Sequence, residues 1–273
     1  MRRILAALLV SGGPLAAQQT STVANPHITI SLVPERATFQ PGQPLRLAVR
    51  FQAEPGWHLY WRNPGQSGIA TSVQWHLPQG FRADSVAWPV PELYDIAGVR
   101  THVMHGESVL LTSIIPPIVA ASSPVRIGAG IRYGICKEVC LPGTANLVLE
   151  LAWANDSRES RGEWGEWTAA LRAAEARRPA AGGPEVRAVL RDTLLVLTVR
   201  AAPGQALPDT LTFFATDRGV LAGATRVAVR RGATSATLHA ALRESLTRLR
   251  GVLVGGSPSA ARPVGWAGDL PVR

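Results

Sequence analysis

The chain has 273 residues, of which 46% are hydrophobic, and it carries a formal net charge of +9. This length and this apolar content suffice for one large or two ordinary domains. The basic residues are nearly all arginines, they are dispersed along the chain, and no basic cluster alternates with aromatic residues. A groove for nucleic acid needs such a cluster, so the composition argues against nucleic-acid binding.

Residues 1–17 have the order of a secretory signal peptide. Arg2 and Arg3 precede an apolar run over residues 4–10, and small residues lead to a plausible cleavage site after Ala17. The apolar run is too short to cross a bilayer. No later apolar stretch approaches the length of a transmembrane helix. We therefore expect an exported, soluble protein in an oxidising compartment, where a disulfide persists.

Residues 25–155 follow a period of two. Apolar and polar residues alternate over 28–32, 45–51, 73–77 and 147–151, and Pro/Gly pairs separate these runs. Short alternating strands with turn signals between them predict an all-β fold, an immunoglobulin-like antiparallel sandwich.

The period changes after residue 156. Apolar residues fall three or four positions apart over 163–178, which predicts one amphipathic helix, and 179–184 has the composition of a linker. Strand patterns return at 194–199, 211–214, 227–229 and 252–254. We therefore expect a helix and linker over 156–184 and a second, smaller β-domain of unknown role over 185–273.

Cys136 and Cys140 are the only cysteines. A disulfide that closes so small a ring stabilises the fold by only about 2 kcal/mol, against about 4.7 kcal/mol for a hundred-residue loop. Redox chemistry is therefore the better first hypothesis. Strand patterns on both sides place the pair at a hairpin tip formed by residues 137–139. Lys137 favours a thiolate and Glu138 opposes it, so the two charges predict no net direction for the thiol pKa values.

Two alternatives remain at this point. The disulfide could be a structural hairpin staple. The cysteines could also join His58, His102 or His105 in a copper or zinc site, although these histidines lack the spacing of a helical ligand pair.

Several dense motifs carry a family resemblance. They are the segments 55–65 (PGWHLYWRNPG), 75–81 (WHLPQGF), 88–92 (WPVPE), 105–107 (HGE) and 133–143 (YGICKEVCLPG). Together, over residues 27–152, they resemble the N-terminal periplasmic domain of the DsbD thiol:disulfide interchange proteins, in particular the suppressor-of-copper-sensitivity branch.

The resemblance implies a periplasmic protein without a cofactor. In that family a cysteine pair on adjacent strands passes reducing equivalents, here through Cys136 and Cys140, with Cys140 the favoured attacking residue. The donor would be a membrane-embedded electron relay or a thioredoxin-like protein, and the acceptor a periplasmic protein with a disulfide. The competing function is a copper- or client-binding sandwich with a structural disulfide.

The resemblance also implies residues around the pair. A cap loop corresponds to residues 89–94, with Leu93 and Tyr94 as the covering side chains. The aromatic pair of the family corresponds to His58 and Tyr60, where His58 replaces a tyrosine. The full set of surrounding residues is His58, Tyr60, Pro91, Glu92, Leu93, Tyr94, Lys137 and Glu138. The family's membrane relay and thioredoxin-like domain have no counterpart here, so we expect a separate membrane partner.

Overall fold

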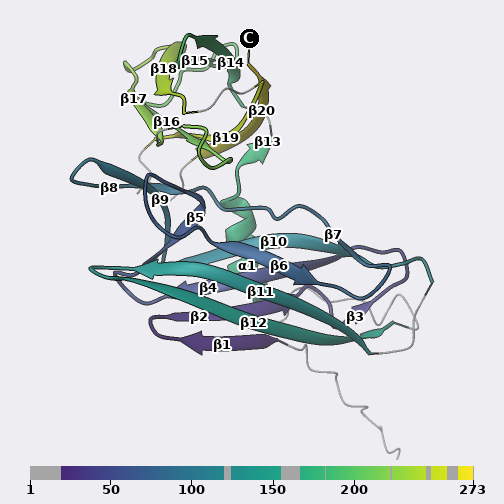
Figure 1. The fold of residues 1–273 in the computed structure, drawn as a ribbon. Coiled ribbons are helices and arrows are strands. Elements are labelled where there is room, and N and C mark those ends of the chain that lie inside the picture. The colour runs from purple at the N-terminus through teal and green to yellow at the C-terminus, as the bar shows by residue number, and fades with distance from the viewer. Residues whose placement is uncertain are drawn as a thin grey trace, which may run out of the picture.

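A computed structural model describes residues 20–119, 124–154, 167–181, 183–221, 223–243, 247–256 and 264–272. The predicted signal peptide over 1–17 and the segment 156–166 lie outside the described residues. The described chain is mostly β-strand (Figure 1).

The first half of the chain forms two packed sheets. One has the strand order β1 (Ser21–Asn25), β2 (Ile28–Pro34), β4 (Leu45–Ala53), β10 (Glu107–Ile115) and β7 (Arg82–Ala83). The other has the order β3 (Thr38–Phe39), β12 (Cys140–Trp153), β11 (Val125–Cys136), β5 (His58–Gly65), β9 (Val99–His105) and β8 (Glu92–Ile96), and β6 (Ser72–His76) also pairs with β11. All strand pairs of these two sheets except β3–β12 are antiparallel. The predicted immunoglobulin-like antiparallel sandwich is confirmed.

The core explains the period of two. Leu147, Leu149 and Leu151 of β12 are buried, whereas Val148 between them is 43% exposed. Alternate residues of a strand point to opposite faces, so one face of each strand lines the core. The same alternation buries Leu45, Leu47, Val49 and Phe51 on β4, although their neighbours there are also partly or fully covered.

The hairpin of β11 and β12 is the longest among the described residues. Its register pairs Val125 with Leu151 at one end and Cys136 with Cys140 at the other. The three residues 137–139 connect the two strands, which confirms the predicted hairpin tip.

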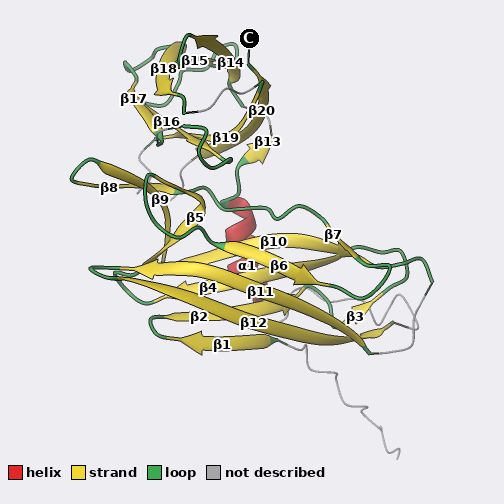
Figure 2. Cartoon of the chain, in the orientation of Figure 1, coloured by secondary structure: helices red, strands yellow, loops and turns green. Residues whose placement is uncertain are grey.

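The helix α1 (Thr168–Ala176) lies beside the first sheet and is shown in red in Figure 2. Leu171 is fully buried against Val33, Ala48, Val109 and Leu111. The helix lies within the predicted range 163–178, of which residues 163–166 are outside the described chain.

The last part of the chain also forms two sheets. One has the order β13 (Ala180–Ala181), β20 (Val264–Pro271), β19 (Arg248–Gly255), β16 (Thr210–Ala215) and β17 (Thr225–Ala228), and the other has the order β14 (Glu185–Arg191), β15 (Leu194–Arg200) and β18 (Ser235–Ala241). A second core fills the space between them. Part of the predicted linker, Ala180–Ala181, instead pairs with β20 as β13.

The two β-regions share buried surface. Phe214, Val252 and Val254 of the later sheets belong to the same apolar cluster as the sandwich core. Figure 1 shows the second region next to β8 and β9. The register of β5 with β9 shifts between Tyr60 and Gly65. Within this stretch, the buried Asn63 donates through Nδ2 to the carbonyl oxygens of Ala215 at 2.8 Å and Asp217 at 3.0 Å.

Candidate redox site

Cys136 ends β11, Cys140 begins β12, and the two form a disulfide with their Cα atoms 4.2 Å apart. They face each other directly across the antiparallel ladder. The two cysteines differ in environment. Cys136 is only 1% exposed, whereas Cys140 is an exposed residue. An attacking thiolate can therefore reach one sulfur more easily than the other.

The strand pairing continues this row of residues beyond the disulfide. Cys136 pairs with His58 of β5, and His58 pairs with His105 of β9. Directly opposite residues of neighbouring strands point to the same face of a sheet, with Cβ atoms about 4.5–5.5 Å apart. Cys140, Cys136, His58 and His105 thus form a row across four strands.

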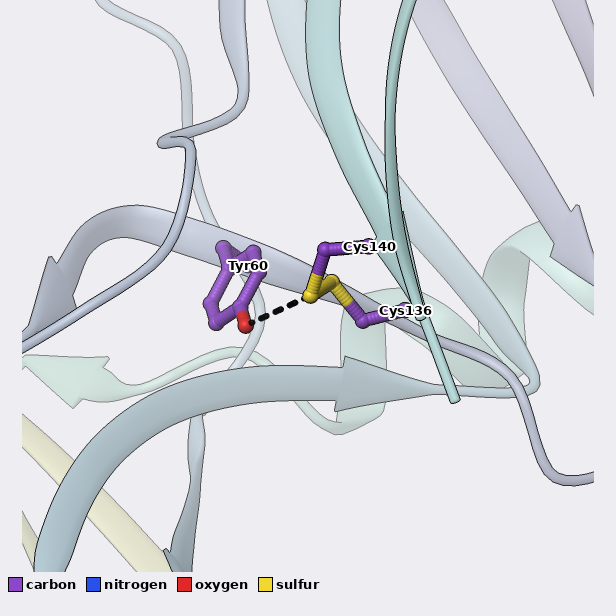
Figure 3. The surroundings of a disulfide bond; sticks show 3 residues. All are labelled: Tyr60, Cys136 and Cys140. Carbon is purple, nitrogen blue, oxygen red and sulfur yellow. Dashed lines mark hydrogen bonds between the residues drawn. A yellow bond between two sulfur atoms is a disulfide. The ribbon is translucent and has the colours of Figure 1, made fainter. Parts of the chain in front are cut away.

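Tyr60 lies on the same face, two residues beyond His58. Its hydroxyl is 3.5 Å from the Sγ of Cys140, and Figure 3 shows it directed at that sulfur. Its ring packs with Val103, Cys136 and Tyr94 in a small apolar cluster, which we call the cysteine cluster. Thr71 holds the strand here by donating its hydroxyl to the carbonyl oxygen of Tyr60 at 2.6 Å.

The predicted covering side chains, Leu93 and Tyr94, both lie on β8, but they point to opposite faces of the sheet. Tyr94 packs against the cysteine cluster, with its ring centroid 4.9 Å from that of His58. Leu93 instead packs against the main sandwich core, because neighbouring residues of a strand point in opposite directions. Pro91, just before the strand, is buried. The role of this segment as a cap stays a prediction.

A contact between side chains joins β8 to β9. Glu92 Oε2 lies 3.1 Å from His105 Nδ1, and both side chains are partly exposed. The ring of His105 in turn lies 5.3 Å from His58 and 5.8 Å from Tyr94, centroid to centroid. The four rings of His58, Tyr60, Tyr94 and His105 therefore form one contact cluster on the face that carries the disulfide.

Burial sets the protonation of this group. It lowers the pKa of His58 from 6.5 to about 4, with a further lowering from His105 and an opposing effect of Glu92. Burial also raises the pKa of the Tyr60 hydroxyl, and Tyr94 adds to this rise. At neutral pH the site therefore contains a neutral imidazole at His58 and a protonated phenol at Tyr60.

Lys137 and Glu138 are exposed at the hairpin tip. The Lys137 side chain extends to Gly56, where an added Cβ would lie 3.2 Å from its Cε. Lys137 therefore covers the turn before β5, and its exposed position leaves its cation in contact with solvent.

The three histidines considered as metal ligands separate in the structure. His58 and His105 lie in the cysteine row, but His102 points to the opposite face, where its Nδ1 donates to the Asn63 carbonyl oxygen at 2.8 Å and its ring contacts Phe214. Among the residues that the structure describes, no three His, Cys, Asp or Glu side chains are grouped so as to hold a metal ion.

Sequence reasoning missed Val103 as a neighbour of the cysteines and considered His105 only as a metal ligand. Their signal was the alternation of 101, 103 and 105 on one strand, which only the pairing of β9 with β5 connects to the site. It also missed Asn63, which holds β5 to the second β-region.

Comparisons with known proteins give one family match and similar folds. Residues 30–152 match the family model described as the thiol:disulfide interchange protein DsbD, N-terminal. The N-terminal periplasmic domain of ScsB from Proteus mirabilis has a similar fold, with a TM-score of 0.68 and 16% identity over 93% of this chain and 99% of that chain. The reduced DsbD N-terminal domain of Neisseria meningitidis is 19% identical over 44% of this chain and 83% of that chain, with a TM-score of 0.28. No curated protein matches the chain.

Proposed function

We propose that the chain relays reducing equivalents through Cys136 and Cys140, and the match of residues 30–152 to the family model of the DsbD N-terminal domain supports this proposal. The family and the disulfide together support a thiol:disulfide exchange domain. In the proposed relay, a membrane-embedded or thioredoxin-like donor reduces the pair, and the pair then reduces a disulfide in a periplasmic acceptor.

The observation that carries the proposal is the unequal exposure of the two sulfur-bearing residues. A donor thiolate attacks Sγ of the exposed Cys140, a donor–Cys140 disulfide forms, and buried Cys136 leaves with the electron pair. The donor's second thiol then attacks the donor sulfur that is bonded to Cys140, and Cys140 leaves. The donor ends with an internal disulfide, and Cys136 and Cys140 are both reduced. Toward the acceptor, Cys140 attacks and Cys136 resolves the mixed disulfide.

Two observations support export to the periplasm. Residues 1–17 have the pattern of a secretory signal. The similar ScsB domain is itself described as periplasmic. Within the described segments, no helix has the length and apolarity required to cross a membrane.

Exposure to a dithiol donor tests the proposal. The oxidised chain is mixed with excess reduced thioredoxin, and free thiols are counted by alkylation and mass spectrometry. We expect two new thiols per chain. A thioredoxin variant that keeps only its attacking cysteine should remain covalently bound, and peptide mapping should place the bond at Cys140.

The matched control is a thioredoxin without either cysteine, which should leave the disulfide intact. Survival of the Cys136–Cys140 bond in excess reduced thioredoxin would show a structural staple and refute the relay. A mixed disulfide mapped mainly to Cys136 would refute the assigned order of the two sulfurs. The Cys136→Ala variant, with Cys140 free, then serves to trap physiological partners for identification.

A further inference from the structure

A buried histidine stands directly opposite the buried cysteine. His58 is 3% exposed, and the β5–β11 ladder pairs it with Cys136. The two side chains point to the same face of the sheet, at the separation of directly opposed residues. In the described chain His58 makes ring contacts with Tyr60, Tyr94 and His105, and no hydrogen bond engages its ring nitrogens.

Opening the disulfide creates a charge beside this ring. When a thiolate bonds to Cys140, Cys136 departs as a thiolate inside the cysteine cluster of Tyr60, Val103 and Tyr94. Burial in apolar surroundings disfavours a thiolate and raises the pKa of a thiol. The nearest cation in the sequence, Lys137, is exposed and extends over Gly56. The buried sulfur therefore needs a donor of another kind.

We propose that the neutral imidazole of His58 donates an N–H hydrogen bond to the Cys136 thiolate whenever the disulfide opens. This inference rests on the proposed function and assigns His58 a role at the buried cysteine of the exchange. The same hydrogen bond acts in both directions of exchange. It stabilises Cys136 as the leaving group when a donor attacks Cys140, and it keeps Cys136 ionised for its attack on Cys140 Sγ when an acceptor is bound there.

The groups around His58 are consistent with a neutral donor. Tyr60 lies on its own strand, Glu92 and Tyr94 come from β8, His105 comes from β9, and Cys136 comes from β11. Glu92 is engaged with His105 at 3.1 Å. Burial keeps the pKa of His58 near 4, so the ring carries one N–H at neutral pH and no charge. A neutral imidazole that donates to a developing anion needs no proton transfer.

Tyr60 and His58 lie beside different cysteines of the disulfide. The Tyr60 hydroxyl lies 3.5 Å from Sγ of Cys140, the exposed half of the disulfide. His58 faces Cys136, the buried half. The donor at the buried cysteine matters more, because solvent replaces a lost hydrogen bond less easily there.

The pKa of the Cys136 thiol tests the inference. In a Cys140→Ala variant of the full chain, Cys136 is the single cysteine, and its ionisation is followed by thiolate absorbance across a pH series. A hydrogen bond to a charged group predicts that adding His58→Phe raises this pKa by about one to two units. His58→Gln keeps a neutral N–H donor of similar reach, so it should restore most of the difference.

A matched control is His239→Phe, the same substitution at an exposed position of β18. It should leave the Cys136 pKa unchanged. Circular dichroism and the melting temperature show that each variant is folded. The inference is overturned by an unchanged pKa in folded His58→Phe, or by an equal rise in His58→Phe and His58→Gln.

This measurement needs no partner protein, so it separates the two claims. If thioredoxin fails to reduce the disulfide but His58→Phe still raises the thiol pKa, the relay is wrong and the hydrogen bond stands. If thioredoxin reduces the wild-type chain and the pKa does not move, the relay stands without His58. Wherever His58→Phe raises the thiol pKa, it should also slow reduction of the intact disulfide by dithiothreitol, because Cys136 becomes a poorer leaving group.

Discussion

Replacing Asn63 tests how strongly the second β-region supports the strand that carries the redox site. In Asn63→Ala, the carbonyl oxygens of Ala215 and Asp217 lose their donors, at 2.8 and 3.0 Å, and the Gly65 N–H loses its acceptor at 3.2 Å. Asn63 is buried, with 6% exposure. Water therefore cannot easily replace these partners.

The expected loss follows from the number of bonds. A hydrogen bond contributes about 1 kcal/mol net, and a buried polar group left without a partner costs about 1–3 kcal/mol. One donated bond to a buried carbonyl oxygen and one to a partly buried carbonyl oxygen therefore predict a loss of about 2–4 kcal/mol in the free energy of unfolding. Urea unfolding of the oxidised chain, followed by tryptophan fluorescence and circular dichroism, measures it.

Asn146→Ala provides the matched control, since Asn146 is exposed on β12 of the same sandwich. Exposed substitutions of this kind usually change stability by no more than about 0.5 kcal/mol. A loss below about 1 kcal/mol in Asn63→Ala would refute the argument that these hydrogen bonds join the two β-regions.

Three further predictions concern the site and its acid response. Tyr94→Ala should speed reduction of the disulfide by dithiothreitol, because water then reaches the buried sulfur, and thiol labelling measures the rate. Gly68→Ala should lower the melting temperature and displace Tyr60, since an added Cβ would lie 2.3 Å from that ring. Burial lowers the pKa values of His58 and His102 from 6.5 to about 4, so the unfolded chain binds more protons between these values. The free energy of unfolding should therefore fall as the pH drops from about 6.5 to 4, and glutamine at either position should flatten this slope in urea titrations.

Two of these predictions have a control variant, and the third has a result that would contradict it. Gly98→Ala meets the same backbone strain at positive φ without any atom within 4 Å of its Cβ, so an equal loss in both glycine variants would contradict the contact with Tyr60. His239→Gln should leave the acid slope unchanged because His239 is exposed. An unaltered reduction rate in Tyr94→Ala would show that this ring does not shield the disulfide.

The fold of the first half was predictable because its strands bury one face. β12 shows this, with buried leucines alternating with exposed residues. The second half was predicted less completely. β18 alternates polar with apolar residues, but most of its apolar residues are alanines and give only a weak signal, and β20 contains glycine, aspartate and proline and carries no clear alternation. Their pairing with β15 and β19 decides their conformation.

The part of the site that is local in the sequence was predictable, and the part that depends on strand pairing was not. The cysteine hairpin was predictable because both cysteines and their turn lie within one short segment. The neighbours of Cys136 come from strands far away in the sequence, and only the register of β5 with β9 and β11 brings His58 and His105 to it. The family resemblance indicated the segment of Leu93 and Tyr94, but the pleat of β8 allows only one of the two to face the disulfide.

The unequal exposure of the two cysteines has a kinetic consequence for the proposed relay. Because donor and acceptor must both bond to Cys140, they cannot occupy the chain together. Turnover would then follow a ping-pong scheme in which each partner leaves before the next one binds. A large excess of either partner should inhibit the other by competing for one sulfur, and the rate of transfer in the cell would depend on how quickly each complex dissociates.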